Sequence, residues 1–330
     1  MMFEKILFST IPIFLVVFVG FLAQRAKIIS EETESSIMQL VLWVLYPSFV
    51  LQKIPGNSNL KDPFLVGTTI AIGAGVVLTG IFICWFVGKL MKIPKSEGLN
   101  TFMIASGIQN YGFIPIPLIA ALFAKEEADR ILGVLFVHSL GIEIVVWTAA
   151  VVIVSGSSSG AWKRLFNGPT IAIVLGLFLN FSGWYTFIPD FIGKPIDMLA
   201  PCAIPIGLLL VGASIGGVLE KEKWKFDWRV MGSGLALRFA ILPMLFLLVA
   251  CAVPFSRELQ ILLLVQAAMP SAVTPILLAR HFGGHPRVAL QVCLTTSLAS
   301  FVLTPLVLTL AFWLMGINLE GFTEPPLPPS

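Results

Sequence analysis

Charged side chains are scarce in this sequence of 330 residues. They make up 12% of it, against about 25% in soluble domains. Water solvates a surface with so little charge poorly, so the composition excludes an ordinary soluble globular protein. The formal net charge of +3 is small and gives no indication of a nucleic-acid partner.

Motifs of catalysis and nucleotide binding are also missing. The sequence contains no H-E-x-x-H pair, no phosphate-binding loop and no dinucleotide-binding glycine pattern, so neither an enzyme nor direct ATP drive is indicated. Residues 212–216 fit G-x-S-x-G, but they lie in an apolar run, where small residues favour close helix packing. Cys84, Cys202, Cys251 and Cys293 fall in apolar runs and are predicted to be small buried hydrophobes. We therefore expect no cofactor and no metal.

The sequence is instead rich in apolar blocks of about twenty residues, the length of a helix that crosses a hydrocarbon core of about 30 Å. Ten blocks are present: about 6–23, 36–53, 64–87, 99–123, 131–154, 169–188, 195–217, 229–253, 258–280 and 288–315. Helices satisfy their own backbone hydrogen bonds inside a bilayer. The sequence therefore predicts an all-α integral membrane protein with about ten transmembrane helices.

A Ser/Gly-rich segment near the middle of the chain divides these blocks five and five. It predicts a first five-helix repeat over 1–154, a central cytoplasmic connection over 155–168, a second five-helix repeat over 169–315 and an extramembrane tail over 316–330. An odd number of helices turns the second repeat upside down, which is the inverted-repeat plan of many secondary transporters. The proline-rich tail cannot form a helix and is predicted to be a floppy end.

Lys and Arg are distributed unevenly between the two sets of alternating connections. The connections after blocks 1, 3, 5, 7 and 9 hold 13 of them, and the termini with the remaining connections hold 7. The positive-inside rule places the first set, which includes Lys221, Lys223, Lys225 and Arg229, in the cytoplasm. The sequence therefore predicts a protein of the inner or plasma membrane with both termini on the extracellular or periplasmic side.

Blocks four and nine each contain two prolines beside Gly or Ser. Pro117 and Pro275 lie 158 residues apart, close to half the chain. Proline removes a backbone donor and clashes with the preceding turn, so each block is predicted to be a helix broken in mid-membrane. A simple kink is the alternative for either block alone, but the matching positions favour a functional break.

Broken backbone at membrane depth lines a polar cavity and presents both carbonyl and N–H groups to a solute. We therefore predict that a substrate binds where the two helices are broken. The candidate residues are Gln109, Asn110, Tyr111, Gly112, Pro115 and Pro117 in block four, and Gln266, Met269, Pro270, Ser271, Thr274 and Pro275 in block nine.

These two segments resemble the auxin efflux carrier family, whose members occur in bacteria and plants. The stretch N-Y-G-F at 110–113, followed by Pro117 and Leu118, is similar to the family's N-x-G-F-x-G-x-P-L. The second stretch has M-P-S-A at 269–272 and R-H-F-G at 280–283, followed by Thr296, Ser300, Thr304 and Pro305. The chain departs from the family at Pro115, where glycine is usual, and at Thr274, where asparagine is common.

The resemblance implies a fold similar to that of the bile-acid/sodium symporters. In such a fold helices 1, 2, 6 and 7 form a scaffold, and helices 3, 4, 5, 8, 9 and 10 form a core in which the two broken helices cross. The core moves against the scaffold in an elevator-type cycle of alternating access. Family substrates are carboxylates such as auxin or malate, so the resemblance implies a small organic anion.

Three ionisable residues lie inside predicted helices, where such residues are costly and usually functional. They are His138 and Glu143 in block five and Arg238 in block eight. Glu143 is a candidate for binding a proton or a cation, and Arg238 for attracting an anion or neutralising Glu143. The structural alternatives are a buried Arg238–Glu143 ion pair and, for His138, a hydrogen-bonded histidine of the core.

Together these features predict a secondary active transporter of a small organic anion, with a proton or sodium as candidate coupling ion. The predicted partners are the substrate and the lipid bilayer, and a homodimer is one candidate assembly. A channel-like facilitator and a membrane receptor for a small solute are the alternatives. No repeated selectivity motif and no soluble output domain supports them.

Overall fold

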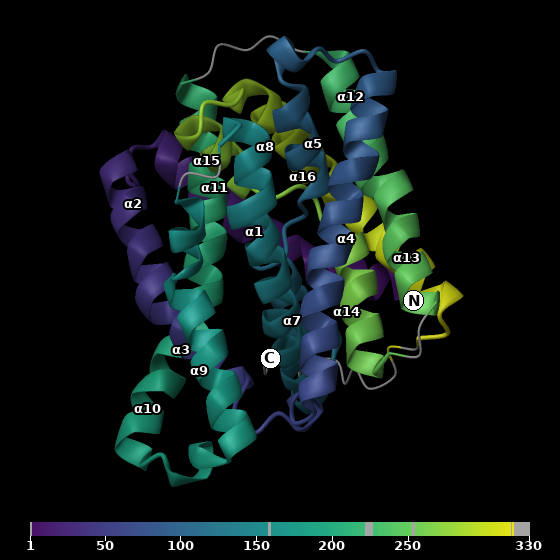
Figure 1. The fold of residues 1–330 in the computed structure, drawn as a ribbon. Coiled ribbons are helices and arrows are strands. Elements are labelled where there is room, and N and C mark those ends of the chain that lie inside the picture. Colours follow the sequence, from purple (N-terminus) through teal and green to yellow (C-terminus); the bar gives the residue numbers. More distant parts are fainter. Residues whose placement is uncertain (1, 158–159, 222–226, 253–254, 318, 320–330) are drawn as a thin grey trace, which may run out of the picture.

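The computed structural model is all-helical and describes residues 2–157, 160–221, 227–252, 255–317 and 319. Lys223, Lys225 and most of the predicted tail lie outside the described residues. In chain order the α-helices are α1 (Met2–Arg25), α2 (Glu31–Leu40), α3 (Tyr46–Lys53), α4 (Pro63–Leu90), α5 (Leu99–Gly107), α6 (Pro115–Leu122), α7 (Lys125–Val145), α8 (Val151–Ser155), α9 (Gly168–Ser182), α10 (Asp190–Leu199), α11 (Ala203–Lys221), α12 (Trp228–Ala236), α13 (Leu242–Ala252), α14 (Arg257–Ala267), α15 (Thr274–His281) and α16 (Pro286–Leu314). Figure 1 shows them packed side by side, with α10 at one end of the molecule.

Most of the predicted transmembrane blocks are long helical stretches. Seven stretches, 2–25, 31–53, 63–90, 125–155, 190–220, 228–252 and 286–314, are long and apolar enough to cross a membrane. They correspond to blocks 1, 2, 3, 5, 7, 8 and 10. Block six is the shorter apolar helix α9 of 15 residues, which ends because Gly183 adopts a left-handed conformation with φ of 72°. Glycine reaches that conformation without the steric penalty of a side chain.

Blocks four and nine are both broken, as predicted. The first ends as α5 at Gly107 and resumes as α6 at Pro115, and the second ends as α14 at Ala267 and resumes as α15 at Thr274. Pro115 and Pro275 occupy the first turns of the new helices. Proline is tolerated there because that turn has no partner for its N–H, whereas inside a helix the ring clashes with the preceding turn.

Three of the long stretches contain a π-helical turn: η1 (Val41–Leu45), η4 (Val146–Ala150) and η8 (Leu237–Ile241). Such turns rotate the following side chains relative to an unbroken α-helix and are frequent at functional sites. Tyr46 follows the first turn directly, and Trp147 and Arg238 lie within the other two.

Glycines allow close backbone contacts at two places in the helices around α1 and α9: between α1 and α11, and between α9 and η1. A Cβ on Gly20 would lie 2.0 Å from the Leu209 carbonyl oxygen, and a Cβ on Gly212 would lie 1.8 Å from that of Val17. Both contacts join α1 to α11, so the close packing predicted for 212–216 is confirmed. A Cβ on Gly168, at the start of α9, would lie 2.0 Å from the Leu42 carbonyl oxygen in η1.

The helices form two packing groups. We call α1–α3 and α9–α11 the scaffold, because α1 packs on α11 and α3 packs on α9 and α10. We call α4–α8 and α12–α16 the core, because α4 packs on α5 and α7, and α16 packs on α12 and α5. Within the core, Gly73 and Gly141 bring α4 and α7 together: a Cβ there would lie 2.2 Å and 2.0 Å from a backbone oxygen of the other helix.

The cysteines divide into two pairs. Cys84 and Cys293 are buried, as predicted, but Cys202 and Cys251 are exposed, so the predicted burial is wrong for these two. They lie on outward faces of their helices. In a membrane protein such faces contact lipid and are as apolar as the buried faces, so the sequence does not distinguish the two. All four are free thiols.

The glycine contact between α1 and α11 generates the first prediction. Replacing Gly212 by Val should lower the melting temperature of the purified protein, because the new side chain forces apart two backbones and overpacking costs about 1–3 kcal/mol or more. The matched control is Gly75→Val, because a Cβ on Gly75 meets nothing within 4 Å. Thermal unfolding in the same detergent compares the two, and equal melting temperatures would show that the close contact is not needed.

Candidate functional site

The two broken segments lie antiparallel against each other and share main-chain hydrogen bonds. Asn110 N donates to Pro270 O at 2.7 Å, and Ala272 N donates to Ile108 O at 3.0 Å. Gln109 and Ser271 form an isolated antiparallel β-bridge between these bonds. Four of the 12 predicted break residues, Gln109, Asn110, Pro270 and Ser271, are therefore brought together from segments about 160 residues apart in sequence.

Four helix ends meet around this pairing. The C-terminal ends of α5 and α14 and the N-terminal ends of α6 and α15 all border it. Helix N-termini carry partial positive charge and free N–H groups, so the α6 and α15 ends favour an anion. One of the N–H groups is already capped, because the Asn110 Oδ1 atom accepts from Ile114 N at 3.3 Å.

Side chains from neighbouring helices hold the second break in place. Ser271 N donates to the Thr296 hydroxyl at 3.2 Å, and the Ser271 hydroxyl donates to the Ala105 carbonyl in α5. The Thr304 hydroxyl donates to the Ala268 carbonyl at 2.7 Å. Two polar residues of the second family-like stretch, Thr296 and Thr304 of α16, thus form hydrogen bonds that hold the second break.

The first break is held from α14. Gln266 Nε2 donates to the Tyr111 carbonyl at 3.3 Å, while its Oε1 atom has no partner among the described residues. Both side-chain atoms of Gln109 are likewise buried without a hydrogen-bond partner in the described part of the chain. Amides with unused capacity are able to bind water or a polar solute, because a buried polar group without a partner is unfavourable.

Arg238 is fully buried and contacts the second break rather than Glu143. Its Nε and Nη2 atoms donate to the Met269 carbonyl oxygen at 3.3 Å and 2.9 Å, and its Nη1 atom has no partner among the described residues. The buried Arg238–Glu143 ion pair considered from the sequence is therefore not formed. The carbonyls that follow α14 attract the guanidinium, because a helix C-terminus carries partial negative charge.

Glu143 accepts hydrogen bonds from two neutral donors. The Tyr111 hydroxyl donates to Oε1 at 2.5 Å, and the Trp147 indole N–H donates to Oε2 at 2.6 Å. Tyr111 directly follows Asn110, so the carboxyl group is connected to the paired breaks through one side chain.

His138 is fully buried in α7 and lies beside Gly73 of α4. Neither ring nitrogen has a hydrogen-bond partner among the described residues, so it is not the hydrogen-bonded core histidine considered from the sequence. The close approach of the two helix backbones leaves the ring packed among apolar groups. The structure does not bring His138 into contact with the paired breaks.

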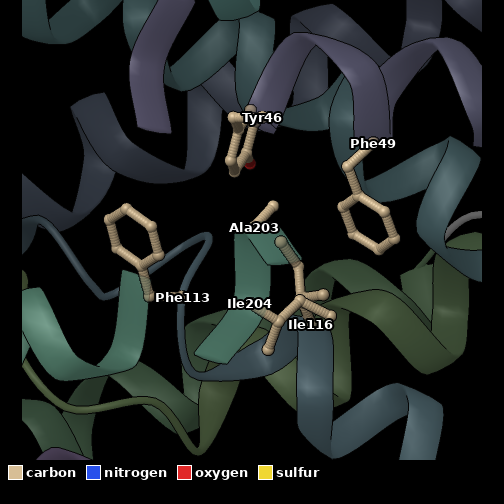
Figure 2. Close-up of a pocket in the computed structure, with 6 residues that line it drawn as sticks. All are labelled: Tyr46, Phe49, Phe113, Ile116, Ala203 and Ile204. Atoms are coloured by element: carbon tan, nitrogen blue, oxygen red, sulfur yellow. The ribbon is translucent and has the colours of Figure 1, made fainter. Parts of the chain in front are cut away.

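An apolar crevice separates the scaffold from the core beside the first break. Figure 2 shows its lining residues, which are Tyr46, Phe49, Ala203 and Ile204 of the scaffold and Phe113 and Ile116 of the core. It encloses about 180 Å³ of empty space but is too narrow to admit a water molecule. Phe113 presses on the scaffold at Gly207, where a Cβ would lie 2.4 Å from the ring.

The sequence reasoning missed Tyr46 and Trp147. Trp147 lies four residues after Glu143, and residues at that spacing share a helix face, so the sequence contained the information to predict this contact. The sequence around Tyr46 has no feature that indicates a contact with the first break. Its hydroxyl lies 3.4 Å from the position of a Cβ on Gly112, a contact between the scaffold and the first break that only the packing of distant segments creates.

The bonds of Arg238 generate the second prediction. Replacing it by Met should lower the melting temperature, because it leaves the Met269 carbonyl buried without its donor, and an unsatisfied buried group costs about 1–3 kcal/mol. The control is Arg229→Met in the same helical stretch, whose side chain is 53% exposed. If both variants melted alike, Arg238 would not be needed to hold the second break.

Comparison with known proteins gives the family. The sequence profile described as "Membrane transport protein" matches residues 5–161 and again residues 152–308, which indicates an internal repeat. An uncharacterized transporter of Methanocaldococcus jannaschii is 24% identical over 280 residues, 81% of this chain and 86% of that protein. An uncharacterized transporter of Methanothermobacter thermautotrophicus is 22% identical over 278 residues, 82% of this chain and 87% of that protein. Auxin efflux carrier component 3 of Arabidopsis thaliana is 24% identical over 157 residues, 47% of this chain and 23% of that protein. The chain therefore belongs to the membrane transport protein family of the auxin efflux carriers, as a multi-pass membrane transporter.

Proposed function

We propose that this protein is a secondary active transporter that carries a small organic anion by alternating access. The observation that carries the proposal is the pairing of two broken helices, with Asn110 N bonded to Pro270 O and two helix N-termini at the same place. Interrupted helices of this kind form substrate sites in many secondary transporters, where the N-terminal ends face anionic groups.

The proposed architecture is a 5+5 inverted repeat in which the ten blocks form ten membrane-spanning segments, and the broken helices of blocks four and nine cross. Its repeats are 1–154 and 169–315, joined by the connection 155–168 in the cytoplasm, with both termini outside. The double match of one family profile supports the repeat, and the excess of Lys and Arg in alternate connections supports the orientation. An elevator-type motion would slide the core along the scaffold.

An organic anion suits the proposed site better than a cation. The N-termini of α6 and α15 and the amides of Gln109 and Asn110 provide donors, and Arg238 adds a positive charge beside the second break. Auxin, the substrate in the names of two plant relatives, is itself an organic acid. The apolar crevice next to Phe113 adjoins the site, and it would have to widen from this conformation to accept the hydrocarbon part of a carboxylate.

Glu143 is the proposed site of ion coupling, with a proton as the favoured ion. No cationic side chain pairs with it within the described residues, and both of its oxygens accept from neutral donors. A sodium ion at the second break would compete with Arg238, which already donates to the Met269 carbonyl. Arg238 supports the charge balance of the site, and His138 is a weaker candidate because it lies away from the breaks.

A carrier also fits the apolar crevice better than a channel-like facilitator or a membrane receptor. The crevice beside the site is too narrow to admit a water molecule in this conformation, and in a carrier it would open only when the core moves. Single-channel current steps in a planar bilayer would overturn this choice, whereas saturable uptake at far lower flux would support it.

Asn110 provides the test of the site. Asn110→Ala should weaken the binding of a transported carboxylate about tenfold or more, because a hydrogen bond to a charged group contributes about 1.5–3 kcal/mol. Binding is measured as the rise in melting temperature with a panel of mono- and dicarboxylates, and uptake in proteoliposomes. The control is Asn100→Ala, whose side chain bonds the Ile153 carbonyl outside the site. Unchanged binding and uptake in a folded Asn110→Ala protein would reject the site.

Glu143 provides the test of coupling. Glu143→Gln should retain carboxylate binding but lose accumulation driven by a pH gradient, because the amide cannot exchange a proton. The matched control is Glu126→Gln, in the exposed first turn of the same helix. Uptake is measured with and without an imposed pH gradient. A variant that still accumulates substrate in response to the gradient would exclude Glu143 as the coupling residue.

A further inference from the structure

Arg164 lies in the central connection, in the 3-10 helix η5 (Ala161–Leu165). Its guanidinium carbon is 5.0 Å from the centre of the Phe282 ring and 5.7 Å from that of Trp147. A guanidinium within about 6 Å of an aromatic face is attracted to it. Among the described residues no carboxylate forms an ion pair with Arg164, so the two rings are its principal side-chain partners.

The main chain of Arg164 is attached to the scaffold. Its carbonyl oxygen accepts from Asn167 Nδ2 at 3.1 Å, and Asn167 Oδ1 in turn accepts from Thr170 N at 2.9 Å, which caps the start of α9. The next residue, Gly168, is in close contact with the Leu42 carbonyl of the scaffold. The main chain of Arg164 is thus tied to the start of α9 and, through α9, to η1, while η5 also packs against η4 and α7 of the core.

The side chain of Arg164 contacts the core. Trp147 lies in η4 and donates to Glu143, whose other oxygen accepts from Tyr111 beside the paired breaks. Phe282 caps the end of α15, the half-helix whose N-terminus borders the same breaks, and packs against the buried apolar cluster of the core. The two rings thus belong to the helices that carry the proposed coupling residue and half of the proposed site.

We propose that Arg164 is a positioning residue that bridges the scaffold to the core and must release both rings in each transport cycle. The proposal rests on the proposed alternating-access function, in which the core moves relative to the scaffold. The attraction between a guanidinium and a ring is short-ranged, and the contact with Trp147 is already near its limit. If the hydrogen bond to Asn167 holds the Arg164 backbone at the start of α9, a shift of the core by a few ångströms separates the guanidinium from the rings.

The bridge has a counterpart at the other end of the scaffold–core interface. Lys53 Nζ of α3 lies 2.7 Å from Asp129 Oδ1 of α7, and Asn57 Nδ2 donates to the Arg130 carbonyl at 3.2 Å. That contact joins residues on two ordered helices. Arg164 differs because it lies in the connection between the two repeats.

Amide hydrogen–deuterium exchange of the protein in lipid nanodiscs tests the bridge without any substrate. Arg164→Ala and Phe282→Ala should each raise exchange in peptides covering 161–167 by about two- to fivefold, from the size of exposed cation–π interactions. The double variant should exchange no faster than Arg164→Ala, because that single change already removes the contacts with both rings. Lys163→Ala is the matched control, since Lys163 contacts no ring among the described residues. Equal exchange in Arg164→Ala and Lys163→Ala would overturn the bridge.

Transport kinetics test whether release matters for function. With a carboxylate identified by thermal stabilisation, Arg164→Ala should change the turnover rate about two- to fivefold while KM stays within error, because Arg164 does not touch the proposed site. A turnover rate equal to that of Lys163→Ala would overturn the role in transport. If no carboxylate is bound or transported by the unsubstituted protein, the proposed function fails, and the exchange result still decides whether the bridge exists.

Discussion

Two broken helices supply the hydrogen-bond partners that each lacks by itself. The N–H of Asn110 and the carbonyl of Pro270 pair in one direction, and Ala272 and Ile108 pair in the other. In a membrane interior an unpaired main-chain group costs several kcal/mol, so neither break is stable without its counterpart. Side chains of the core satisfy the main-chain groups that this pairing leaves without a partner. The groups that remain, at Met269, Ala268 and Ala105, receive donors from Arg238, Thr304 and Ser271.

The same pairing concentrates polarity at one depth in an otherwise apolar molecule. Proline-induced ends bring two helix N-termini and two C-termini together, and their opposite partial charges can bind both signs of charge. Arg238 lies against the carbonyls after α14, which leaves the N-terminal ends and the amides of Gln109 and Asn110 for an anion. Tyr111 connects Glu143 to the paired breaks, so the proposed coupling residue and the proposed substrate site would be linked without direct contact.

The contacts within each helix group differ in kind from the contacts between the groups. Inside the scaffold and inside the core, glycines let backbones touch, as at Gly212 and Gly141, and such contacts cannot slide without a large steric penalty. Between the groups many contacts are made by side chains, among them Phe113 on Gly207 and the Lys53–Asp129 ion pair, although a Cβ on Gly133 would also lie 3.0 Å from the Lys53 carbonyl oxygen. Side chains change rotamer far more readily than backbones separate, so the proposed alternating access would use the boundary between the groups as its plane of movement.

The sequence alone determined the apolar blocks, the two breaks and the residues around them. These features depend on local chemistry: the length of an apolar run and the clash of a proline ring with its own preceding turn. It also pointed to Glu143 and Arg238 as ionisable residues inside helices, and the ion pair between them, considered as one alternative, is not formed. Only the tertiary structure decided that Arg238 binds the Met269 carbonyl, that Tyr111 and Trp147 donate to Glu143, and that Tyr46 and Arg164 reach the core. Those partners come from segments far apart in the chain, and their contacts depend on helix rotation and packing depth, which the pattern of apolar and polar residues along one helix does not specify.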